Sequence, residues 1–105
     1  MEVIFNTDNQ IDGKERVGSY FSKQIREELS RFEEKVTRIE VHLSDVNSTK
    51  KGGENDIKCV LEARPKGFKP VAVTSFGDNV ERAISGAIKK VESSLSSLFG
   101  KVQVK

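Results

Sequence analysis

Residues 37–45 read Thr37-Arg38-Ile39-Glu40-Val41-His42-Leu43-Ser44-Asp45, with apolar side chains at positions 39, 41 and 43. Because successive side chains of a β-strand point to opposite faces of a sheet, this alternation predicts a strand with one buried and one exposed face. The alternation returns at 57–64, after a polar, glycine-containing segment at 46–55 that has the composition of a loop. A turn at 65–70 leads to a last strand, 71–76. These connections predict three antiparallel strands in a row.

Two helices are expected beside these strands. After a short strand at 2–7, apolar residues recur at steps of three and four over a segment of about 13–34, which is the spacing of one helical face. These residues are Val17, Phe21, Ile25, Leu29 and Phe32. A second helix follows the break at Gly77-Asp78-Asn79 and ends at a glycine C-cap near Gly100. Its apolar stripe consists of Val80, Ile84, Ala87, Val91, Leu95 and Leu98.

Both helices begin with a carboxylate pair at capping-box spacing, Asp12 with Glu15 and Asp78 with Glu81. The element order is therefore βαβββα. Because each helix has one apolar stripe and each strand one apolar face, we expect an α+β fold. In this fold two helices pack on one face of a four-stranded sheet, as in double-stranded-RNA-binding domains. The expected core consists of Phe21, Ile25, Ile39, Val41, Leu43, Ile57, Cys59, Leu61, Ile84 and Val91.

The size and composition of the chain are those of one globular domain. With 105 residues, of which 35% are hydrophobic and 32% charged, residues 1–105 are expected to fold around a single core. No apolar run approaches the roughly 18 residues of a membrane span, and the acidic, polar start differs from a signal peptide. The lone Cys59 offers no disulfide and no metal-ligand spacing. We therefore predict a cytoplasmic protein without membrane association, metal or cofactor.

The sequence gives little support for catalysis. His42 and Cys59 alternate onto opposite faces of the predicted sheet, so they could not share a proton. Gly52 and Gly53 do not form a phosphate-binding loop, because no lysine and helix follow them at the required spacing. We predict that the protein is not an enzyme and has no small-molecule substrate.

Basic residues are concentrated in the C-terminal part of the chain, although the net charge is only +2. Residues 1–62 contain 10 Lys/Arg and 13 Asp/Glu, whereas residues 63–105 contain 8 and 3, so the two parts carry −3 and +5. A basic segment of this kind favours a polyanionic partner.

The cations of the second helix fall on its outer face and one flank, away from Glu81 and Glu92. Gly86 lies among them, and a glycine inside a helix costs about 1 kcal/mol relative to alanine, so close approach of a phosphate backbone would explain it. We expect an RNA-binding surface made of Arg82, Lys89, Lys90 and Lys101, with a second cluster at the strand turn, Arg64, Lys66 and Lys69. A solvated basic face and turn remain the alternative explanation for both clusters.

Several short motifs in the sequence are similar to those of a known family. The motifs are the run Arg38–Asp45, then Lys51-Gly52-Gly53, Cys59, Glu62-Ala63-Arg64, Ala83-Ile84 and Lys90. Together they resemble the ribosome hibernation-promoting family, also described as sigma-factor modulation proteins or ribosome-associated inhibitors, in its short form. The resemblance covers nearly the whole chain and has the same βαβββα order.

This resemblance implies a function on the ribosome. Family members bind ribosomal RNA (rRNA) of the small subunit in the channel for messenger and transfer RNA, and silence translation under stress. Long members carry a second, dimerising domain, whereas this chain ends at Lys105, so no dimerisation domain is expected. Lys90 matches a lysine in the family's last helix, but Ser93 and Val80 replace its usual arginine and tyrosine.

Two other functions are compatible with the sequence. A double-stranded-RNA-binding module would share the αβββα core, although its last helix normally begins with lysines rather than with Asp78-Asn79-Val80-Glu81. A protein-interaction module that modulates a transcription factor would instead use the exposed face of the sheet. The residues of that face are Arg38, Glu40, His42, Lys58, Glu62 and Arg64.

Overall fold

A computed structural model describes residues 1–8, 14–46 and 57–103 of the chain. Its elements are β1 (Glu2–Thr7), α1 (Lys14–Glu28), the 3₁₀ turn η1 (Ser30–Phe32), β2 (Val36–Asp45), β3 (Ile57–Pro65), β4 (Val71–Gly77) and α2 (Val80–Gln103). This order confirms the predicted βαβββα pattern and the α+β class. The capping pair expected at Asp12 and Glu15 lies outside the residues whose side chains are described.

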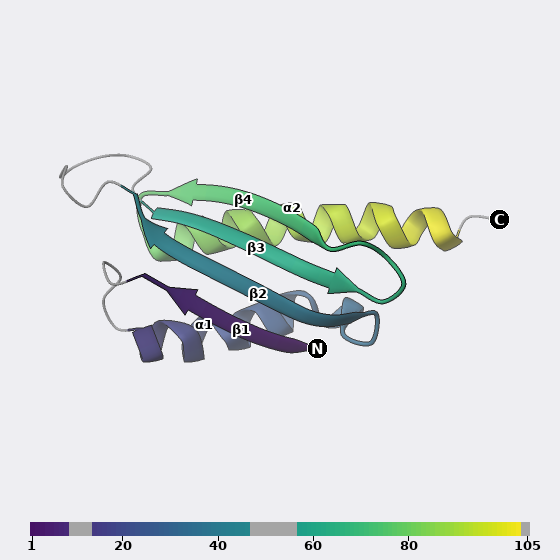
Figure 1. Cartoon of the computed structure of the whole chain (residues 1–105), viewed down its shortest axis with the longest axis horizontal. Coiled ribbons are helices and arrows are strands. Elements are labelled where there is room, and N and C mark those ends of the chain that lie inside the picture. The colour runs from purple at the N-terminus through teal and green to yellow at the C-terminus, as the bar shows by residue number, and fades with distance from the viewer. Residues whose placement is uncertain (9–13, 47–56, 104–105) are drawn as a thin grey trace.

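The four strands form one sheet in the order β1-β2-β3-β4. β1 is parallel to β2, and the other two pairs are antiparallel, so the predicted row of three antiparallel strands is confirmed. Figure 1 shows both helices behind the same face of the sheet, α1 behind β1 and α2 behind β3 and β4. We call the opposite face, which no helix covers, the open face.

The core between sheet and helices follows from the strand alternation. Ile39, Val41 and Leu43 of β2 are buried, whereas His42 between them is exposed. A shift of one residue would have inverted this pattern. β3 alternates in the same way, and α2 adds Ile84, Ile88 and other buried residues. All ten residues predicted for the core are buried in one cluster.

The first helix is shorter than the predicted 13–34. α1 ends at Glu28, and Leu29 leaves the helical region with φ −106° and ψ 20° before the 3₁₀ turn begins. Leu29 and Phe32 are nevertheless buried, because the tighter turn still directs both side chains toward the core. Apolar spacing alone therefore could not distinguish a continuous helix from a helix followed by a 3₁₀ turn.

The second helix differs from the prediction at both ends. Asn79, and not Asp78, is the N-cap, because its Oδ1 accepts a hydrogen bond from the Arg82 amide at 2.8 Å. At the other end α2 continues through Gly100 to Gln103. Gly100 does not have the positive φ of a left-handed C-cap, a conformation found among the described glycines only at Gly67.

Small residues let the first turns of α2 lie close to β4. On the inner face of β4 the side chains become smaller along the strand, from Val73 through Ser75 to Gly77. A Cβ at Gly77 would lie 2.7 Å from the Ala83 amide nitrogen, and a Cβ at Gly86 would overlap Ser75 Oγ. Close packing of α2 on β4 thus requires glycine at both positions.

Candidate nucleic-acid interface

Three of the four cations predicted on α2, namely Arg82, Lys89 and Lys90, have described side chains; all three are exposed, and two of them have partners. Arg82 pairs with Asp78 at 3.5 Å. The prediction that this surface is free of carboxylates is therefore wrong. Lys89 is exposed and has no ion-pair partner among the described residues. The side chain of Lys101 lies outside the described part of the chain. The outer face of α2 is therefore less basic than expected.

Lys90 is directed toward the sheet edge. Its Nζ donates a hydrogen bond of 2.6 Å to the backbone carbonyl of Thr74 in β4. β4 is an edge strand, and an edge strand presents carbonyls that no neighbouring strand pairs. Lys90 therefore covers part of this edge. The sequence resemblance to the family's lysine did not predict this structural contact.

Gly86 does not support close approach of a phosphate backbone, contrary to the sequence analysis. Its helical position faces Ser75 of β4, where any Cβ would overlap the serine hydroxyl. Internal packing fully accounts for the glycine.

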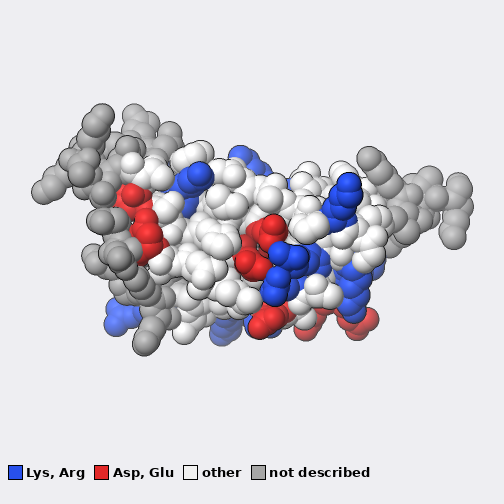
Figure 2. All heavy atoms as spheres, viewed as in Figure 1, with Lys and Arg blue, Asp and Glu red and all other residues white. Residues whose placement is uncertain are grey.

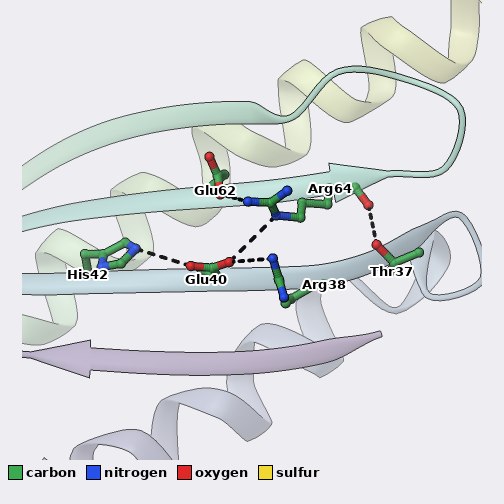
Figure 3. Close-up of polar contacts among 6 residues, drawn as sticks. All are labelled: Thr37, Arg38, Glu40, His42, Glu62 and Arg64. Atoms are coloured by element: carbon green, nitrogen blue, oxygen red, sulfur yellow. Dashed lines mark hydrogen bonds and ion pairs between the residues drawn. The ribbon is translucent and has the colours of Figure 1, made fainter.

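The predicted turn cluster of Arg64, Lys66 and Lys69 divides into two parts. Lys66 and Lys69 are exposed in the β3–β4 turn. Arg64 instead lies on the open face, where it pairs with Glu40 at 3.7 Å and with Glu62 at 3.3 Å (Figure 3). Only the two lysines thus form a cationic turn.

The open face carries a balanced network of charges, and Figure 2 shows uncharged surface to the left of this network and above it. Arg38 pairs with Glu40 at 3.0 Å, and His42 Nε2 lies 3.7 Å from the same carboxylate (Figure 3). A register shift at Thr37 lets its hydroxyl donate to the Arg64 carbonyl at 3.0 Å. With two arginines and two glutamates, this network has no excess positive charge for a phosphate.

Two cations that the sequence analysis did not select lie near the cationic turn. Arg31 belongs to η1, and the backbone carbonyl of Lys35 accepts a hydrogen bond of 2.9 Å from the Lys66 amide. No signal in the sequence singled out these two residues, because they belong to no cluster of cations along the chain. The 3₁₀ turn brings them to the same end of the molecule as Lys66.

Comparison with known proteins identifies the family. The family model described as "Sigma 54 modulation protein / S30EA ribosomal protein" matches residues 5–103. The chain belongs to this family. The resemblance predicted from the sequence is thereby confirmed, and the Sigma 54 modulation / S30EA family consists of ribosome-associated modulation factors and is not known as an enzyme family.

The solved structures agree with this fold. The chain is similar to a ribosomal subunit interface protein from Coxiella burnetii, with a TM-score of 0.69 over 95% of this chain and 99% of that one. The two sequences are 13% identical, so this similarity shows only that the two proteins share a fold. No curated protein matches the sequence.

The single cysteine of this family member is not activated for catalysis. Cys59 is buried, and desolvation raises the pKa of its thiol to about 12, so the thiol stays protonated and weakly nucleophilic. The described residues contain no group of three His, Cys, Asp or Glu side chains placed to hold a metal ion. No described helix is long and apolar enough to cross a membrane.

Proposed function

We propose that this protein is a ribosome hibernation factor that silences translation by binding rRNA of the small subunit near the messenger and transfer RNA channel. Its membership of the Sigma 54 modulation / S30EA family, over residues 5–103, carries this proposal. In this proposal the protein acts in the cytoplasm, and residues 1–105 form one ribosome-binding domain.

The exposed cations support binding through the RNA backbone. Lys66, Lys69 and Lys89 are exposed and have no ion-pair partner among the described residues, so each can neutralise a phosphate. Arg82 contributes less, because Asp78 already offsets part of its charge. Lys90 can release its carbonyl contact for a phosphate, since its side chain is exposed. We assign Arg64 the weakest role, because two carboxylates surround it.

Co-sedimentation with purified ribosomal subunits tests this function. The protein is expected to pellet with small subunits and not with large subunits at about 50 mM salt, and to dissociate at about 200 mM. Four phosphate contacts, from Lys66, Lys69, Lys89 and Lys90, predict a slope of log affinity against log salt of roughly −3 to −4. Failure to pellet with small subunits at the lower salt, or binding that salt does not weaken, would disprove the proposal.

A protein partner is the second candidate function, and the open face favours it. The charge network of this face has two arginines and two glutamates, and Phe76 is 49% exposed on the same face. A mixed polar surface with an exposed aromatic ring suits a protein interface better than a phosphate backbone. Substituting Phe76→Ser would then abolish capture of the modulated transcription factor and leave ribosome binding intact.

A further inference from the structure

At one end of the molecule, aromatic rings join three segments and a backbone hydrogen bond joins a fourth. Phe32 of η1 stacks on Phe99 of α2 at a centroid distance of 6.0 Å, and Phe68 of the β3–β4 turn meets Phe99 edge-on at 5.8 Å. The Lys66–Lys35 backbone hydrogen bond connects the turn to the segment that precedes β2. Phe32 and Phe99 are buried, so the base of this end is packed and fixed. In Figure 2 Lys and Arg side chains gather on the surface of the same end, to the right of the view, with acidic side chains along its lower border.

A small hollow opens at this end. It has a volume of about 260 Å³ and is lined by Arg31, Phe32, Lys35, Ser96, Phe99 and Gly100. Of these described lining residues two are cations and none is a carboxylate. Glu33 and Glu34 are exposed in the adjoining segment but do not line the hollow.

Each of the two cations of the hollow lies against an aromatic ring. The Arg31 guanidinium lies 4.6 Å from the centroid of Phe32, and Lys35 Nζ lies 5.1 Å from the centroid of Phe99. A cation–π contact holds a cation in place without neutralising its charge. Lys35 therefore keeps a full positive charge beside the hollow.

Arg31 also keeps donors available. Its hydrogen bond to Ser96 and its ion pair with Glu92 both use Nη2, whereas a guanidinium has five N–H donors. The Glu92 pair is 3.6 Å long and largely exposed, with 60% of the arginine side chain accessible. Exposed pairs of this kind contribute little, so a phosphate could compete with Glu92 for the arginine.

We infer that this hollow binds a phosphate group of an RNA strand, held jointly by Arg31 and Lys35, while Lys66 and Lys69 contact neighbouring phosphates. The inference rests on the proposed function and adds a site to it. The volume is below the roughly 300–1,000 Å³ of small-molecule pockets, which favours one phosphate of a chain over a free small ligand. Two cations beside an aromatic base match a single anionic group, and the lysines of the adjacent turn extend the site along a strand.

The test replaces both cations together. Arg31→Gln with Lys35→Gln should weaken co-sedimentation with small subunits roughly tenfold at about 50 mM salt, and flatten the salt slope by about 1.4 to 1.8, because two phosphate contacts are lost. The matched control is Arg16→Gln with Lys23→Gln, which removes one arginine and one lysine from the exposed surface of α1. If both double variants lose affinity equally, the hollow is not a phosphate site.

A third variant separates binding from structural support. Glu92→Gln removes the ion pair of Arg31 but leaves its guanidinium in place. If Arg31 binds phosphate, this variant should bind as tightly as the unmodified protein or more tightly. If Arg31 only links η1 to α2, Glu92→Gln should weaken binding as the Arg31→Gln, Lys35→Gln double variant does. That result would show that the inference is wrong.

A direct binding experiment distinguishes this inference from the proposed function. A single-stranded 12-nucleotide RNA is added to the isotopically labelled protein, and amide shifts are followed by NMR. Changes at 31–35 and 96–100 support the hollow, and their absence on saturation overturns it. If the protein fails to pellet with small subunits but shows these shifts, the proposed function fails and the phosphate site stands.

Discussion

The surfaces at the two halves of α2 differ in where their cations come from and in what those cations contact. In the first half, Arg82 is paired with Asp78, Lys90 is bonded to the Thr74 carbonyl, and Gly86 lets the helix lie close to β4. In the second half, Phe99 packs against Phe32 and Phe68, and the cations beside it, Arg31 and Lys35, come from other elements. The contacts of a cationic side chain, more than its position on a helix, therefore decide how much positive charge it can offer to an RNA phosphate.

Charge reversal should give the largest difference between the halves. Arg31→Glu with Lys35→Glu replaces two attractions by two repulsions, and we expect small-subunit affinity to fall at least about 100-fold, or about 2.7 kcal/mol. Arg82→Glu with Lys90→Glu should reduce it less, because Lys90 is bonded to the Thr74 carbonyl and neither residue lines the hollow. Co-sedimentation at constant salt measures both losses. Equal losses would show that net charge alone governs binding.

Gly86→Ala tests why the first half contains a glycine. The added methyl group would overlap Ser75 Oγ, and overpacking typically costs 1–3 kcal/mol, partly offset by about 1 kcal/mol of helix propensity. We expect the free energy of unfolding to fall by about 1 kcal/mol in a urea titration. Ribosome affinity of the folded protein should stay unchanged. Ser75→Gly should restore stability in the double variant; a loss of affinity without a loss of stability would return Gly86 to the RNA interface.

The smallest expected effects separate two cations within the first half. Lys89→Gln should flatten the salt slope by roughly 0.7 to 0.9, the value of one phosphate contact. Arg82→Gln should flatten it less, because Asp78 already offsets this arginine. The salt dependence of co-sedimentation measures both slopes, and Lys23→Gln on α1 is the control. A larger change in salt slope for Arg82→Gln than for Lys89→Gln would show that the Asp78 ion pair does not reduce the contribution of Arg82 to binding.

The order of elements, the buried face of each strand and the family could be predicted from the amino-acid sequence. Ile39, Val41 and Leu43 could face only one way, because a period of two fixes which side chains share a face. The burial of Phe21, Ile25, Ile84 and Val91 followed in the same way from helical spacing. Such periodic signals are local, so they survive without knowledge of what the element packs against.

Which cations lack a partner could not be predicted, because it depends on contacts between elements far apart in the chain. Arg64 and Glu40 are 24 positions apart in the chain and meet because β2 and β3 pair, and Lys90 reaches Thr74 because α2 lies against the edge strand. The 3₁₀ turn places Arg31 next to Phe99, with which it shares no sequence pattern. Electrostatic partners depend on distance in space, and a linear pattern of charges holds no information about which distant carboxylate, carbonyl or ring will lie within a few ångströms of each cation.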